Sequence, residues 1–155
     1  MEFESLEAII DFAIEKEIEA ADFYQGLSRE ASMSGAKQML EEFAREESKH
    51  QALLEKIKSK GFDESVVEYK FKWIPDLKRS DYLVELEYSD GMGYSELLLL
   101  AMKREEKALA LYNILLKRAE GIEGQKFFKI LCQEEANHKL KLETLYDDYM
   151  AEMGD

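Results

Sequence analysis

The feature that most constrains the fold of this sequence is an internal duplication that places acids and histidines within apolar helical stripes. In the segment FAREESKHQALL (residues 43–54), Glu47 and His50 stand between Phe and Leu at successive spacings of four, three and four residues. On a helix, positions with these spacings share one face. Adding 88 maps the pair onto Glu135 and His138 without a gap. A core-facing stripe that twice carries ionisable residues must provide partners for them inside the fold.

Four long segments show the alternating three- and four-residue apolar spacing of helices packed in a bundle. They cover about residues 5–31, 34–60, 95–119 and 123–150. The same shift of 88 maps the first pair of segments onto the second, and eight stripe positions are identical in the two halves: Ala13, Glu17, Ala20, Tyr24, Leu27, Glu47, His50 and Leu54. We therefore predict two duplicated helix pairs, about 5–60 and 95–150, in a single domain of residues 1–155.

The connections between these segments set the topology. Short links within each pair predict antiparallel neighbours, and Gly61 is expected to end the second helix. About 34 residues, 61–94, separate the pairs, and a link of this length can cross a bundle from end to end. We expect it to contain an extended segment against the helices and a short helix near residues 81–87. The predicted class is all-α, an antiparallel four-helix bundle with one long crossover between helices two and three.

Composition excludes several classes of function. The chain has 34 acidic and 21 basic residues and a formal net charge of −13, which disfavours binding to nucleic acid or to anionic membranes. A single cysteine, Cys132, allows neither an internal disulfide nor a four-cysteine metal site. The longest apolar run, residues 97–102, is too short to span a bilayer, and no signal-peptide pattern opens the chain. We expect a cytoplasmic protein.

The ionisable stripe residues point to a metal centre. No lysine or arginine lies in any of the four stripes to neutralise the acids, so a bound cation is the remaining solution. Four carboxylates balance two divalent ions, and carboxylate with imidazole suits iron or manganese better than zinc. The ions of such sites stand about 3.5–4 Å apart, and Glu47 and Glu135 could bridge them. The candidate ligands are Glu17, Glu47, His50, Glu105, Glu135 and His138.

Three further kinds of stripe residue have both a packing and a functional interpretation. Tyr24 and Tyr112 follow the lone glutamates by seven residues and either pack in the core or hydrogen-bond a ligating carboxylate. Ala20 and Ala108 either leave room for a small oxygen species or allow close helix packing. Cys132 maps onto an alanine and is expected to be an inert core thiol.

The motifs EIEAADFY (17–24), FAREESKH (43–50), REEKALALY (104–112) and CQEEANH (132–138) resemble the rubrerythrin-like branch of the ferritin-like superfamily. In ferritin-like di-iron or di-manganese proteins, two helices each supply a Glu and the other two each supply a Glu-x-x-His. The resemblance covers all four predicted helices and implies a ferritin-like bundle, two bound iron ions and the six ligands named above. It also implies that Glu47 and Glu135 bridge the ions.

The resemblance implies an oxidoreductase that reduces hydrogen peroxide or dioxygen. Two departures from the family pattern matter. The sequence has no paired Cys-x-x-Cys motif for a rubredoxin-like iron site, so the electron donor must be a separate protein such as a rubredoxin. Ala108 stands where rubrerythrins carry an additional glutamate, three residues after Glu105.

Two alternatives remain open at the level of sequence. One is a ferroxidase that stores or delivers iron inside a multimeric shell, and the other is a non-enzymatic helical module with a structural metal. Our expectation for the assembly is a homodimer, which argues against a shell.

Overall fold

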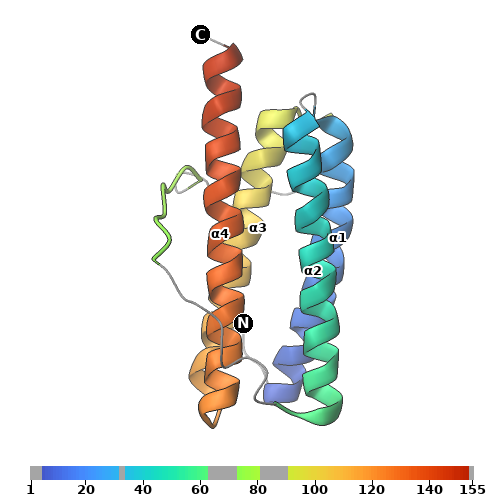
Figure 1. The fold of residues 1–155 in the computed structure, drawn as a ribbon, viewed down its shortest axis with the longest axis vertical. Coiled ribbons are helices and arrows are strands. Elements are labelled where there is room, and N and C mark those ends of the chain that lie inside the picture. Colours follow the sequence, from blue (N-terminus) through green and yellow to red (C-terminus); the bar gives the residue numbers. More distant parts are fainter. Residues whose placement is uncertain (1–4, 32–33, 63–72, 81–90, 154–155) are drawn as a thin grey trace.

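The computed structural model describes residues 5–31, 34–62, 73–80 and 91–153. The described residues form four helices: α1 (Leu6–Glu30), α2 (Ser34–Lys60), α3 (Tyr94–Arg118) and α4 (Ile122–Met153). α1 packs against α2 and α3 against α4, and the two hairpins lie side by side (Figure 1). No strand occurs in these ranges. The predicted all-α bundle is confirmed, and α4 continues past its expected end and projects beyond the other helices (Figure 1).

Local sequence signals set the helix ends. The Ser5 side chain accepts a hydrogen bond from the Ala8 backbone N–H at 3.1 Å and so caps the start of α1. Gly61 follows α2 with a φ of 79°, and its N–H donates to the Ile57 carbonyl at 2.8 Å. A side chain disfavours this left-handed conformation, which explains why a glycine ends α2 at the predicted place.

The hydrophobic core is divided into two clusters at different levels of the bundle. One includes Ile9, Leu54, Leu115 and Phe128, and the other includes Leu40, Phe43, Leu98 and Leu142. On every helix the predicted ligands fall between a stretch of one cluster and a stretch of the other. The ionisable layer is therefore enclosed by apolar packing on both sides along the bundle axis.

The described part of the crossover is fixed to α4 by a fully buried acid. Glu143 accepts hydrogen bonds from the backbone N–H of Leu77 at 3.1 Å and of Arg79 at 2.9 Å. The Lys139 ammonium donates to Glu143 at 3.2 Å and also to Asp76. The buried carboxylate therefore has both a cation and backbone donors as partners, which offsets the cost of its burial.

The structure tests only part of the crossover prediction. Residues 73–80 lie beside α4 and contain neither helix nor strand, and most of the segment expected to be extended lies outside the described residues (Figure 1). The short helix expected near residues 81–87 lies outside the described residues. Among the described helices, none has an apolar stretch of the length needed to cross a membrane.

Candidate metal centre

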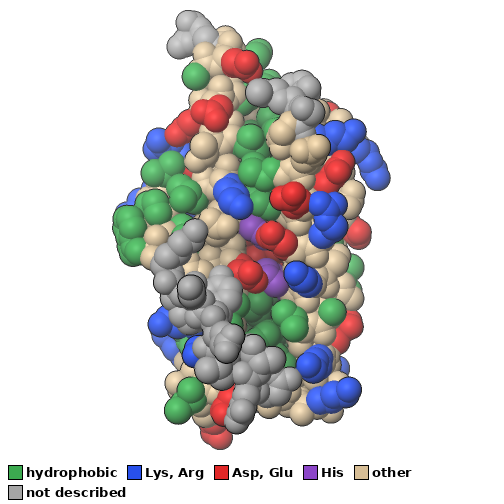
Figure 2. All heavy atoms as spheres, viewed as in Figure 1, with side chains coloured by type: hydrophobic (Ala, Val, Ile, Leu, Met, Phe, Trp, Pro, Cys, Tyr) green, Lys and Arg blue, Asp and Glu red, His purple; other side chains and the backbone are tan. Residues whose placement is uncertain are grey.

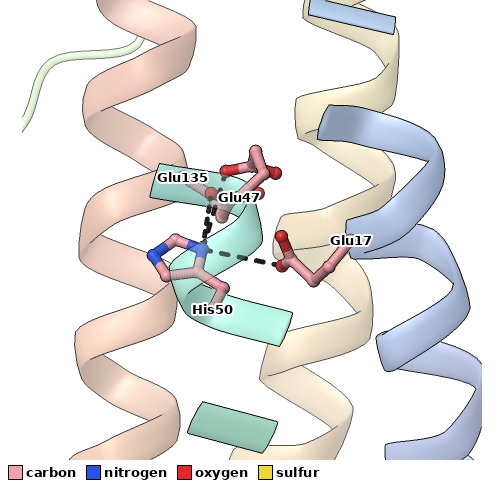
Figure 3. Close-up of side chains that lie close together, drawn as sticks. All are labelled: Glu17, Glu47, His50 and Glu135. Carbon is pink, nitrogen blue, oxygen red and sulfur yellow. Dashed lines mark ion pairs between the residues drawn. The ribbon is translucent and has the colours of Figure 1, made fainter. Parts of the chain in front are cut away.

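Three carboxylates from three helices converge on one nitrogen of His50 (Figure 3). The Nδ1 atom lies 3.6 Å from Oε1 of Glu17, 3.6 Å from Oε1 of Glu47 and 3.5 Å from Oε1 of Glu135. These distances exceed those of good hydrogen bonds. They suit ligands around a shared ion, because bonds of about 2.1 Å at right angles place neighbouring ligand atoms about 3 Å apart.

A matching set surrounds His138. Its Nδ1 atom lies 3.2 Å from Oε1 of Glu47, 3.7 Å from Oε1 of Glu105 and 3.5 Å from Oε1 of Glu135. Within each set the potential ligand atoms all lie within 4.8 Å of one another. Glu47 and Glu135 belong to both sets. The structure thus brings together all six residues singled out from the sequence, in two sets that share the two acids expected to bridge.

These six residues are buried, and some of their polar side-chain atoms have no hydrogen-bond partner. Each is only 1–2% exposed. Each also has a buried side-chain oxygen or nitrogen without a hydrogen-bond partner: Glu17 Oε2, Glu47 Oε1, His50 Nδ1, Glu105 Oε2, both carboxylate oxygens of Glu135, and His138 Nδ1. Buried polar atoms are normally satisfied, and so many orphans in one place require an explanation. A pair of cations among them would satisfy the set, so the residues present fit such a group.

Glu47, Glu135 and both histidines of the site bind protons more tightly than free side chains do, because their pKa values are raised. Burial raises the pKa values of Glu47 and Glu135 well above the ordinary glutamate value, and the charges of neighbouring carboxylates raise them further. Burial alone would lower the pKa of His50, but its hydrogen bond to Glu134 and the nearby acids outweigh this and raise it to about 10. The pKa of His138 is raised for similar reasons. Protons therefore compete with cations for these groups.

Two tyrosines hydrogen-bond the lone glutamates across the two hairpins. Tyr24 on α1 donates to Oε1 of Glu105 on α3, and Tyr112 on α3 donates to Oε1 of Glu17 on α1. Burial and the adjacent carboxylates raise the pKa of both phenols well above 10. Each tyrosine is therefore a neutral donor that orients a carboxylate, which is the functional interpretation considered for it from sequence.

Sequence reasoning missed two acids that bind the outer nitrogens of the histidines. Glu134 on α4 contacts Nε2 of His50 at 2.7 Å, and Glu46 on α2 contacts Nε2 of His138. Both acids are partly exposed, and Figure 2 shows histidine atoms and acidic side chains together in the middle of the face formed by α2 and α4. The sequence did contain a signal for these two acids. Each directly precedes a stripe glutamate, and the 88-residue shift maps Glu46 onto Glu134.

The remaining positions singled out from the sequence are two alanines beside a cavity and one partly buried cysteine. Ala20 and Ala108 line a cavity that also reaches Glu17 and Glu105, so their small size leaves open space beside the site. Cys132 is partly buried against an apolar cluster, and burial raises its pKa to about 11. Its thiol therefore stays protonated at neutral pH, as expected for an unreactive cysteine.

The fold and the site together define a ferritin-like four-helix bundle with an internal carboxylate and histidine centre. The Rubrerythrin family model matches residues 8–146, and the chain belongs to this family. Comparison with proteins of curated function gives no match.

Two solved structures resemble the chain along most of its length. A hypothetical protein from Pyrococcus furiosus is 30% identical, with a TM-score of 0.70 and coverage of 93% of this chain and 89% of that one. A protein from Thermotoga maritima described as a ferritin-like diiron-carboxylate protein is 22% identical, with a TM-score of 0.72 and coverage of 97% and 99%. The second likeness concerns the fold alone.

Proposed function

We propose that the six buried residues bind two iron ions and that the protein is an oxidoreductase that reduces hydrogen peroxide or dioxygen. The observation that carries the proposal is the pair of ligand sets sharing Glu47 and Glu135. Four carboxylates neutralise two divalent ions, and the mixed oxygen and nitrogen donors suit iron first, manganese second and zinc least. Two redox-active ions bound there supply the two electrons that the oxidant takes up.

The chain's own side chains would orient this centre and control access to it. Tyr24 and Tyr112 hold the lone glutamates in place by hydrogen bonds. Glu46 and Glu134 bind the outer histidine nitrogens, which directs Nδ1 of each ring toward the ions. The apolar clusters on both sides of the site exclude water and so strengthen the electrostatic interactions among the charged residues of the site.

Electrons must reach this centre from outside the bundle. The sequence contains one cysteine and cannot build a four-cysteine iron site of its own. We therefore propose a separate electron-donor protein such as a rubredoxin, and a homodimer as the working assembly. Sedimentation of the purified protein tests the second point, because a shell of many subunits would favour iron storage instead.

The direct test is anaerobic titration with ferrous ion, followed by addition of hydrogen peroxide. We expect two ions bound per chain and oxidation of both by one equivalent of peroxide, seen as a change in absorbance. Glu47→Ala should abolish both, because Glu47 belongs to both ligand sets. Glu42→Ala, an exposed acid on the same helix, is the matched control and should behave as wild type.

Two results would count against the proposal. Stoichiometric metal binding without peroxide-dependent oxidation would rule out the redox role and leave a binding function. Complete unfolding on metal removal would instead indicate a structural ion, as in small metal-dependent domains.

A further inference from the structure

The 88-residue duplication relates the two ligand sets of the site to each other. We call them the Glu17 set (Glu17, Glu47, His50 and Glu135) and the Glu105 set (Glu47, Glu105, Glu135 and His138). In both sets a tyrosine donates to the lone glutamate, and an outer acid contacts Nε2 of the histidine. These hydrogen bonds therefore give neither ion position an advantage over the other.

One buried aromatic ring beside the site does not follow the duplication. Phe43 on α2 is 1% exposed, and its ring stacks on the imidazole of His138, with centroids 4.1 Å apart and planes inclined by 22°. The shift of 88 maps Phe43 onto Leu131, an aliphatic residue in the other core cluster. Among the described residues, the only ring paired with His50 is that of His138 itself, at 6.5 Å between centroids. His138 thus has a close stacking partner that His50 lacks.

Tyr24 connects this stack to the lone glutamate of the same set. Its ring lies edge-on to that of Phe43, with centroids 5.4 Å apart, and edge-on to that of His138 at 6.3 Å. Its hydroxyl donates to Oε1 of Glu105. Tyr112, its counterpart in the duplication, donates to the other lone glutamate but has no ring partner among the residues that the structure describes. One aromatic cluster therefore contacts both Glu105 and His138, and the Glu17 set has no equivalent of it.

A stacked ring matters to a histidine ligand because rotation of the imidazole about χ2 is soft. Phe43 restricts this rotation before an ion arrives, so His138 loses less conformational freedom when it binds the ion. Contacts that orient a metal ligand in this way raise the affinity of the site. The free energy of one aromatic pair corresponds to a factor of about three to ten in an equilibrium constant.

We infer that the two ion positions are not equivalent, that the Glu105 set binds its ion first, and that Phe43 is the positioning residue responsible for this order. Glu47 and Glu135 belong to both sets and so cannot cause the difference. A chain that holds a single ion holds it mainly at His138. The inference rests on the ion binding proposed above but not on the reaction with peroxide or dioxygen.

The two histidines of the chain allow a direct test, because each belongs to one ligand set only. Metal-free protein with isotope-labelled histidines is titrated with Zn²⁺, a diamagnetic ion that undergoes no oxidation, and the ring nitrogens are followed by NMR. His50→Gln and His138→Gln assign the two sets of signals. We expect the Nδ1 signal of His138 to shift ahead of that of His50, with dissociation constants that differ by about three- to tenfold.

Variants at Phe43 test whether its ring sets the order. Phe43→Leu introduces the residue found at the equivalent position 131 and should remove the preference, so that both signals shift together. Phe43→Met also removes the ring, and its adaptable side chain fills the space in case the leucine variant does not fold. Phe128→Leu is the matched control and should keep the order, because Phe128 is equally buried but has Phe62 and Phe127 as its ring partners. A general loss of packing would weaken both sets alike, whereas loss of the stack weakens only the Glu105 set.

Three outcomes would overturn the inference. The first is simultaneous shifts of both signals in wild type, and the second is an earlier shift of the His50 signal. The third is equal weakening of both sets in Phe43→Leu, which would reduce Phe43 to a packing residue. Each of these leaves the proposed function intact if two ferrous ions still bind and react with peroxide. If neither histidine signal responds and no ferrous ion binds, the proposed ion site is refuted together with the inference.

Discussion

Replacing Glu135 by leucine should stabilise the metal-free protein although it removes a central residue of the site. Glu135 is 1% exposed, and both its carboxylate oxygens lack hydrogen-bond partners. Burial raises its pKa well above the ordinary value, which shows that the folded state disfavours its charged form. A leucine of similar size removes this cost, and we expect a gain of about 2 kcal/mol in the free energy of unfolding. In a chain of this length that gain raises the melting temperature by about 4–8 °C.

The neighbouring acid provides a control with the opposite sign. Glu134 is 35% exposed on its side chain and contacts Nε2 of His50 at 2.7 Å. Glu134→Leu makes the same chemical change one residue earlier but leaves a buried imidazole nitrogen without its partner. We expect a loss of about 1–3 kcal/mol. If Glu135→Leu and Glu134→Leu changed stability in the same direction, the contrast drawn between them would be wrong. That contrast is that Glu135 lacks hydrogen-bond partners whereas Glu134 has one in His50.

Urea unfolding followed by circular dichroism, in the presence of a chelator, measures both variants. A carboxyl whose pKa is higher in the folded than in the unfolded state stabilises the fold at low pH and loses that contribution as pH rises. The stability advantage of Glu135→Leu over wild type should therefore grow as pH increases above about 4.3, the unfolded value. A variant less stable than wild type at pH 7 would refute the reasoning. With metal present the order should reverse, because Glu135 belongs to both ligand sets.

Three other predictions follow from named contacts. Glu105→Leu should reduce metal binding from two ions to one, measured by anaerobic titration, because Glu105 belongs to only one ligand set; unchanged stoichiometry would contradict this. Tyr24→Phe removes the hydrogen bond to Glu105 and should lower metal affinity by about 10- to 100-fold in the same titration, whereas equal affinity would reduce the tyrosine to a packing role. Glu143→Ala leaves the buried Lys139 without one of its two partners and should cost about 3–5 kcal/mol in urea unfolding. Hydrogen exchange at the Leu77 amide should accelerate in that variant, and unchanged protection would show that the crossover is held elsewhere.

The local pattern was enough to predict the four helices and the residues that meet inside them. Helical periodicity fixes which residues share a face, and it predicted that the stripes containing Glu17 and Glu105 face the interior of the bundle. Gly61 and the short links within each pair set the main helix ends and the hairpin topology. The family membership and the ferritin-like bundle expected from these motifs are confirmed.

Periodicity could not reveal the pairing of side chains between helices. Tyr24 binds the glutamate of the other half of the duplication, and Glu46 binds the histidine of the other half. Such crossed pairs depend on the relative height and rotation of the helices, which are set by packing of the whole core. An acid beside a stripe glutamate looks like a solvent-exposed residue until the opposite helix is in place.

The sequence by itself determined that each of the two helix pairs would bury its glutamates and its histidine on the core-facing side. The spacing of residues along one helix is a local property, and it decides which side chains share a face. Only the tertiary structure decided that Glu143 would hydrogen-bond the backbone of the crossover. It also decided that Ala20 on α1 and Ala108 on α3 would line a cavity beside the site. Both depend on distances between segments that are remote in the chain, and these distances exist only once the hairpins have packed.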